Sequence, residues 1–367
     1  MTSSRSPDCA CCTSATSEHR NNGVVASTAS LTDSWMLGSL RVPNRVMLAP
    51  LAGIGNWFVR LQAKRYGAGM AFSEMVSSHA IHYGNEKTCV EMLRIDPRER
   101  AGGPVSIQLF GEDPEMMRAA AAHVALVGAD AIDINMGCPV AKVQKTGAGA
   151  ALLGDPDRAV AVAQAAVQGA VAEAGTLPVT VKLRSGLRPG ETSGFQLAHR
   201  LVDEAGVSAI AFHPRSAAVQ HRGVPDYALA ARLVQSLPAP VILTGGLSDA
   251  AAVREAFAST GAAAVMLARG ALGNPWLFAE LLGERERGPT PEEVLSELDW
   301  TIDRAVEHLG PARATRYLRK FYPWYVQRLA LDAQAAKRLQ ASLQTAETLD
   351  DVGELLDPAR RPVALVL

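Results

Sequence analysis

The chain has 367 residues, of which 48% are hydrophobic and 20% charged, values typical of a globular protein with a large core. Its formal net charge of −1 excludes a general attraction to nucleic acids or membranes, so an anionic partner needs a local basic patch. There is no apolar run long enough to predict a membrane span, and five cysteines without a pairing pattern suit a reducing compartment. We therefore expect a cytoplasmic protein.

Residues 1–35 predict an unstructured tail. They are rich in Ser, Thr and Ala, show no helical or strand period, and lack the apolar core of a signal peptide. Cys9, Cys11, Cys12 and His19 lie there, but no second pair of ligands stands at a zinc-like spacing. We therefore predict no metal site.

From about residue 44, short apolar runs alternate with longer Ala-rich amphipathic stretches. Stretches such as 113–128 and 155–175 begin with Asp-Pro and end at Gly, which are helix start and stop signals. The runs predict eight strands, within residues 46–53, 69–76, 104–111, 131–139, 178–186, 209–215, 240–246 and 263–270.

Eight buried strands alternating with helices predict an α/β fold, a parallel (β/α)₈ TIM barrel over residues 36–287. A doubly wound open sheet is the alternative, but it would not need eight repeats, and no GxGxxG motif follows the first strand. Residues 288–352 show helical patterns only, which predicts a small all-helical domain. We expect residues 353–367 to form a C-terminal tail.

Polar side chains and glycines stand at the carboxyl ends of the predicted strands, where the active sites of such barrels lie. Gly245, Gly246 and Arg269, at the last two ends, offer backbone N–H groups and a positive charge to a phosphate. Lys182, at the fifth, suits either an electron-rich cofactor ring or a salt bridge at the rim. Together these residues are compatible with a bound FMN without requiring one.

The segment DINMGCPVAK, residues 133–142, places Cys138 on a Gly-Pro turn directly after a predicted strand. A structural cysteine would more often lie within the apolar run. The position of this thiol at the barrel rim therefore makes Cys138 a candidate catalytic residue.

Several segments resemble, in order and spacing, the motifs of the tRNA-dihydrouridine synthases. They are MLAPLAG, GMAFSEMVSS, SIQLFG, DINMGCPVAKVQKTGAGAALL, VTVKLRSG and MLARGALGNPWLF. The resemblance covers about residues 40–335. It implies an FMN enzyme that reduces the C5–C6 bond of particular uridines in tRNA with NADPH as the electron source.

The resemblance also implies a role for each site residue. Cys138 would be the general acid that protonates C5 while a hydride reaches C6, and thiols, which titrate near pH 8.5, are mostly protonated at neutral pH. Asn135 would help to hold the uracil. FMN would be lined by Pro50, Leu51, Ala52, Gln108, Lys182, His213, Gly245, Gly246, Ala268 and Arg269.

Further contacts with tRNA are expected from Lys142, Arg184, Arg215, Arg319 and Lys320. The predicted helical domain mixes basic and aromatic residues, as suits phosphate contacts and base stacking, although about half of its aromatic residues should form the core of that domain. We expect a monomer.

The chain departs from the family pattern after three strands, the first of which is followed by Gly55-Asn56 where the family usually has Thr-Asp. It has His213-Pro214-Arg215-Ser216-Ala217 where the family usually has His-Gly-Arg-Thr-Arg, and Thr244-Gly245-Gly246 where it has Asn-Gly-Asp. Two other functions remain as alternatives. One is a flavin barrel that acts on a free pyrimidine, like dihydroorotate dehydrogenase, and the other is a non-catalytic RNA-binding barrel.

Overall fold

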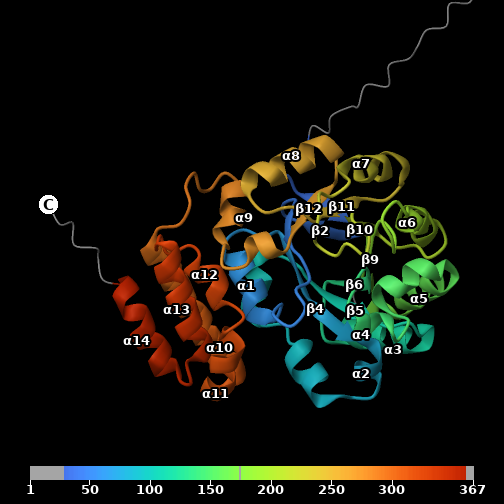
Figure 1. Cartoon of the computed structure of the whole chain (residues 1–367). Helices are drawn as coiled ribbons and strands as arrows, with labels where there is room; N and C mark the ends of the chain where they lie inside the picture. The colour runs from blue at the N-terminus through green and yellow to red at the C-terminus, as the bar shows by residue number, and fades with distance from the viewer. Residues whose placement is uncertain (1–28, 173–174, 361–367) are drawn as a thin grey trace, which may run out of the picture.

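The structure, a computed structural model, describes residues 29–172 and 175–360. Its centre is a closed parallel barrel of eight strands, which confirms the predicted TIM barrel (Figure 1). Each strand falls within one of the eight predicted runs, to within a residue. In chain order they are β3 (Val46–Leu48), β4 (Met70–Ser77), β5 (Val105–Phe110), β6 (Ala131–Met136), β9 (Val179–Arg184), β10 (Ala209–His213), β11 (Val241–Thr244) and β12 (Ala264–Leu267).

A short antiparallel hairpin, β1 (Trp35–Leu37) and β2 (Leu40–Val42), precedes the barrel. Trp35, Leu37 and Val42 are buried in one cluster with Met47 and Met70, which stand near the amino-terminal ends of barrel strands. The hairpin therefore covers the end of the barrel opposite to the carboxyl ends. Residues 29–35 belong to the described structure, with Leu31 and Trp35 buried, so the expected boundary of the tail at residue 35 is wrong. Residues 1–28 lie outside the described residues.

Helices surround the barrel (Figure 1). Asp113 and Asp155 cap α3 and α5 with their carboxylates, as the Asp-Pro signals predict. The α-helices are α1 (Trp57–Arg65), α2 (Ser78–His82), α3 (Pro114–Leu126), α4 (Ala141–Gln144), α5 (Pro156–Gly169), α6 (Ser193–Asp203), α7 (Tyr227–Ser236), α8 (Ala250–Thr260) and α9 (Trp276–Leu281). A π-helical turn, η1 (Thr88–Met92), and 3₁₀ turns, η2 (Pro97–Gly102), η3 (Gly149–Gly154) and η4 (Arg269–Ala271), lie between them.

Helix α5 ends at Gly169, earlier than the predicted end at residue 175. The chain then forms a second small hairpin, β7 (Val171–Ala172) and β8 (Gly175–Thr176). Gly175, the first residue of β8, has a φ of +120°, a backbone conformation that favours glycine. The prediction failed here because the segment is made of good helix formers.

Five helices follow the barrel: α10 (Pro291–Leu309), α11 (Pro311–Leu318), α12 (Tyr322–Val326), α13 (Ala333–Thr345) and α14 (Leu349–Arg360). They form one group beside α1 and α9 (Figure 1). Helix α14 continues past residue 352, where we expected a tail to begin, because Val352 and Leu356 are buried in the core. Residues 361–367 lie outside the described residues. No helix among the described residues is long and apolar enough to cross a membrane.

Two sets of contacts hold α10–α14 against the barrel. In the first, buried Glu297 of α10 accepts hydrogen bonds from Gln62, Arg65 and Tyr66 at the end of α1, at 2.8, 3.1 and 2.7 Å. In the second, Tyr317 of α11 donates to the carbonyl of Ile54 at 3.2 Å, and Lys320 donates to that of Gly53 at 2.9 Å. The second set ties the helices to the loop between β3 and α1.

Candidate active site

A cavity of about 800 Å³ opens at the carboxyl ends of the barrel strands. This volume lies within the range of ligand pockets, about 300–1,000 Å³. All eight barrel strands, or the segments that directly follow them, contribute to its wall. Trp324, Gln327 and Arg328 of the helical group also line it, so the site is shared between the barrel and the helices.

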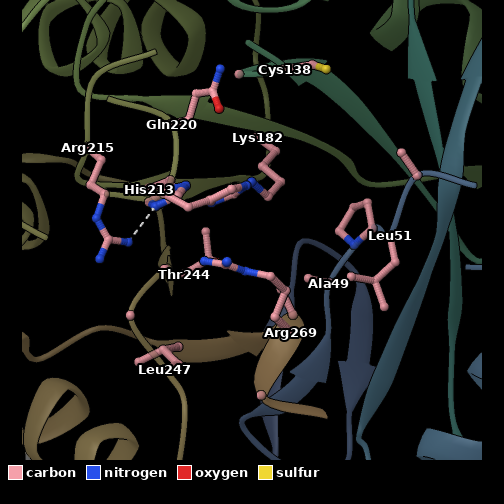
Figure 2. A pocket seen from close by; sticks show the side chains of 18 of the residues that line it. Ala49, Leu51, Cys138, Lys182, His213, Arg215, Gln220, Thr244, Leu247 and Arg269 are labelled. Carbon is pink, nitrogen blue, oxygen red and sulfur yellow. Dashed lines mark hydrogen bonds between the residues drawn. The ribbon is translucent and has the colours of Figure 1, made fainter. Parts of the chain in front are cut away.

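The cavity brings most of the predicted site residues together. Cys138 and all ten residues expected around FMN line it, as do three of the six expected substrate residues, Asn135, Arg184 and Arg215. Figure 2 shows Lys182, His213 and Arg269 gathered in the middle of the pocket and Cys138 on its rim. Lys142, Arg319 and Lys320 do not line it.

The lining of the cavity is strongly positive. It includes Lys182, Arg184, Arg215, Arg269 and Arg328, and no Asp or Glu among the described residues. Neither the ammonium of Lys182 nor the guanidinium of Arg269 has a hydrogen bond or ion pair with another described residue. The arrangement therefore suits an anionic ligand.

The loops after β11 and β12 offer backbone donors to the same space. The N–H groups of Gly246, Arg269 and Gly270 donate no hydrogen bond to any other described residue. Gly245 and Gly246 have φ values of +96° and +80°. A Cβ on Gly245 would overlap the imidazole of His213, and one on Gly246 would lie 2.6 Å from Tyr227 Oη. These positions need glycine for both backbone and steric reasons.

Inward-facing side chains of β5, β6 and β9 form a polar layer at the base of the cavity. Strand register places Gln108 beside Asp133 and Asp133 beside Thr180, and two residues further on it places Asn135 beside Lys182. Burial raises the pKa of Asp133, while burial and then Arg184 lower the pKa of Lys182. The mutual attraction of Asp133 and Lys182 opposes both shifts.

The turn that carries Cys138 is held by Asn135. Asn135 Oδ1 accepts hydrogen bonds from the backbone N–H groups of Gly137 at 3.2 Å and Cys138 at 2.8 Å. Asn135 Nδ2 donates to Gln108 Oε1 at 2.9 Å. Cys138 itself is partly exposed.

Two of the cavity's arginines bind the protein backbone. Arg184 donates to the carbonyls of Gly137 and Gln220, at 2.9 and 2.7 Å, and Arg215 donates to that of Gly223 at 2.7 Å. Arg184 is 3% exposed. These guanidinium groups hold the loops of the site in place, a role that the sequence analysis did not predict.

His213 is buried next to this group of cations. Its pKa is lowered well below the ordinary value by burial, and further by Lys182, Arg184 and Arg215. Its Nε2 lies 3.2 Å from the NH1 atom of Arg215, so a neutral imidazole can accept a hydrogen bond there (Figure 2). His213 is therefore neutral at neutral pH.

The three predicted substrate residues outside the cavity have different surroundings. Lys142 is exposed on α4, close in the chain to Cys138. Arg319 donates to the carbonyl of Ala346, and Lys320 donates to that of Gly53. Of the aromatic residues in the same segment, Phe321, Tyr322 and Tyr325 are buried in the core, as expected for about half of them, and Trp324 lines the cavity.

Sequence reasoning missed several lining residues. His221 stacks on His213 with ring centroids 6.1 Å apart, and Gln220 and Leu247 also face the pocket. None of them stands at a strand end. The contribution of Trp324, Gln327 and Arg328 depends on how the helices return to the barrel, for which a sequence pattern carries no signal.

The fold and the cavity define a TIM-barrel enzyme whose active site suits an anionic ligand. Residues 47–362 match the family model of dihydrouridine synthase (Dus). A probable tRNA-dihydrouridine synthase 1 from Synechocystis sp. is 36% identical over 337 residues, which cover 90% of each chain. The tRNA-dihydrouridine synthase B of Yersinia pestis is 34% identical over 319 residues, or 86% of this chain and 96% of that one. This chain belongs to the dihydrouridine synthase family and is an oxidoreductase, which confirms the resemblance.

Solved structures share the barrel at low sequence identity. Morphinone reductase has a TM-score of 0.52 and 18% identity, covering 74% of this chain and 94% of that one. A complex of 2-naphthoyl-CoA reductase has a TM-score of 0.55 and 13% identity, covering 70% of this chain and 52% of that one. At these identities the likeness shows the fold alone.

Proposed function

We propose that this chain reduces specific uridines in tRNA to 5,6-dihydrouridine with FMN as cofactor and NADPH as electron donor. The observation that carries the proposal is one cavity that contains both Cys138 and all ten residues expected around FMN, with no carboxylate in its lining among the described residues. A tRNA substrate implies that the enzyme acts in the cytoplasm, and we propose that it acts as a monomer.

The residues present fit FMN. The free N–H groups of Gly246, Arg269 and Gly270, with the unpaired guanidinium of Arg269, would hold the phosphate. Gln108 uses one amide hydrogen for Asp133 and shares its oxygen with Asn135, which leaves one N–H and one lone pair for a pyrimidine edge. Pro50, Leu51, Ala52, His213, Gly245 and Ala268 would complete the wall.

Lys182 has no acceptor among the described residues, so its ammonium is available to the electron-rich edge of a flavin ring. When bound and reduced by NADPH, FMN would supply the hydride that goes to C6 of the uracil. Cys138 would give the proton to C5 and then regain one from solvent, which its partial exposure allows. The chain's own contribution is to hold this thiol on the turn anchored by Asn135.

The remaining substrate contacts would come from both parts of the chain. The second amide hydrogen of Asn135 makes a long contact with Met75 Sδ, at 4.0 Å, which a uracil oxygen would replace. Trp324 and Arg328 reach the cavity from the helices, which supports a macromolecular rather than a free pyrimidine substrate. Exposed Lys142 would meet a phosphate outside the cavity. We assign Arg184, Arg215 and Lys320 to holding loops in place, and Arg319 to binding the Ala346 carbonyl.

The test uses tRNA from a strain without dihydrouridine synthases. Purified protein with FMN and either NADPH or NADH is incubated with this tRNA, and dihydrouridine is counted position by position by mass spectrometry. Dihydrouridine should appear at defined positions. Cys138→Ala should keep bound FMN and slow the reaction by about 10²–10⁴, the usual effect of losing a general acid.

Three other results would contradict parts of the proposal. A full rate in Cys138→Ala would remove the thiol as proton donor. Bound flavin that consumes NADPH without making dihydrouridine would favour a free pyrimidine substrate. A protein that binds tRNA but no flavin would favour the non-catalytic barrel.

A further inference from the structure

Asp133 is a buried carboxylate to which the proposed reaction gives no role. It lies on β6, is fully buried, and does not line the cavity. Its two neighbours across the strands, Gln108 on β5 and Thr180 on β9, face the same interior space. Gln108 Nε2 donates to Asp133 Oδ2 at 2.6 Å, and Thr180 Oγ1 donates to Asp133 Oδ1 at 2.5 Å.

These contacts begin a chain of hydrogen bonds that ends at Cys138. Gln108 Oε1 accepts from Asn135 Nδ2 at 2.9 Å, and Asn135 Oδ1 accepts from the N–H of Cys138 at 2.8 Å. Each amide side chain therefore donates toward Asp133 and accepts from the side of Cys138. The direction is the same at every link.

An ionised carboxylate can only accept hydrogen bonds, whereas an amide can donate or accept on either side. Asp133 therefore requires Gln108 to present its NH₂ group, which leaves the Gln108 oxygen toward Asn135. Asn135 must then present its own NH₂ group to Gln108 and its oxygen to the turn. If the chain of bonds reversed, the Asn135 NH₂ group would face the N–H groups of Gly137 and Cys138, donor against donor.

We propose that Asp133 is a positioning residue that sets the direction of this hydrogen-bond chain and thereby the placement of the Cys138 turn. The part of this proposal that concerns kcat rests on the proposed function. Because Gln108 and Asn135 also line the cavity, the same direction determines which amide hydrogen and which lone pair the site presents to a pyrimidine ring. Asp133 acts through these residues and touches no reacting atom.

The test separates direction from packing with four forms of the enzyme: wild type, Asp133→Asn, Thr180→Val and the double variant. In Asp133→Asn the new amide can donate to Thr180 Oγ1 and still accept from Gln108. In Thr180→Val the carboxylate remains and still only accepts. In the double variant the amide introduced at position 133 has lost Thr180 as a partner, so only the N–H groups of Gly137 and Cys138, at the other end of the chain, still oppose a reversal. Measurements at pH 8, above the pKa of about 6 to which burial raises Asp133, keep this carboxyl ionised.

Two readouts are needed. The first is kcat for tRNA reduction by the FMN-loaded enzyme, with KM and flavin content measured in parallel. The second is the rate at which iodoacetamide alkylates Cys138, followed on its own peptide by mass spectrometry because the chain contains four other cysteines. The alkylation readout needs no tRNA and no turnover.

Each single variant should stay within about threefold of wild type in both readouts, because the direction survives. The double variant should lose roughly 10- to 100-fold in kcat, the effect expected when buried polar groups lose their partners. Its Cys138 alkylation rate should change severalfold. Asp133→Asn then acts as the conservative rescue that a purely structural role would not predict.

Additive effects of the two substitutions on kcat, or equal alkylation rates in all four proteins, would overturn the proposal. If the double variant does not fold, Gln108→Met replaces it in the test. This substitution breaks the hydrogen-bond chain at its next link and must change the alkylation rate of Cys138. If wild type makes no dihydrouridine, the proposed function fails, whereas the alkylation comparison still decides whether Asp133 positions the turn.

Discussion

Replacing Glu297 by Ala should loosen the helical group from the barrel. Glu297 is 4% exposed, and its carboxylate accepts hydrogen bonds from Gln62, Arg65 and Tyr66. Removing the carboxylate leaves three donors at the interface between α1 and α10. The cost of the substitution depends on how well each donor finds another partner.

The three donors differ in the hydrogen-bond partners that remain to them. Tyr66 Oη loses its acceptor in a half-buried position, which costs about 1–3 kcal/mol. Gln62 keeps two hydroxyl acceptors, at 2.9 and 3.1 Å, and loses little. The Arg65 side chain is 40% exposed and stacks on Trp300, so water can replace its partner at a cost of up to about 1 kcal/mol. The expected loss is about 1–4 kcal/mol.

Urea unfolding followed by tryptophan fluorescence measures this loss. The matched control is Asp299→Asn, on the same helix, which breaks an exposed ion pair with Arg360 and should cost less than about 1 kcal/mol. Under the proposed function, Glu297→Ala should also raise KM for tRNA and leave FMN content unchanged. Equal losses of stability in the two variants would refute the reasoning.

Three other predictions follow from the site. Gly245→Ala should lower the free energy of urea unfolding by about 1–3 kcal/mol more than Gly190→Ala. Both glycines have a positive φ, but only at position 245 would the added Cβ overlap a ring, that of His213. Equal losses in the two variants would contradict the overlap. The pKa of His213 is lowered, so the unfolded chain binds a proton that the folded chain does not; stability should fall as pH drops from 7 to 5, and less steeply in His213→Gln. Arg328→Gln should weaken tRNA binding roughly 10-fold in a gel shift, because Arg328 lines the cavity and has no partner among the described residues. The exposed Arg338, outside the cavity, is its control: equal effects of Arg328→Gln and Arg338→Gln would show that only overall charge matters.

The barrel strands were predictable because parallel strands buried on both faces appear in the sequence as uninterrupted apolar runs. Two hairpins were not. Strands of two or three residues show no period, and β1 and β2 become recognisable only when Trp35 and Leu37 have a barrel end to cover. Residues 170–176 consist largely of helix formers, and only the fold shows that α5 ends before them.

The candidate site was predictable as far as strand ends determine position. The ends of the strands meet at one edge of the barrel, so Gln108, Lys182 and His213 had to lie together. What each cation does was not predictable, because the partners of Arg184 and Arg215 are carbonyls of loops whose path depends on the whole fold. Likewise, Lys320 was expected to bind RNA, whereas in the structure it donates to Gly53.

The bonds from Tyr317 and Lys320 to the loop after β3 bear on any attempt to exchange parts between relatives. That loop contains Pro50–Ala52 of the cavity wall. Directly after them come the Gly53 and Ile54 carbonyls, which accept hydrogen bonds from the helical group. A chimaera that took its helices from one synthase and its barrel from another would remove the Tyr317 and Lys320 contacts from Ile54 and Gly53. Exchanging the helical group between relatives therefore requires moving the loop together with the helices.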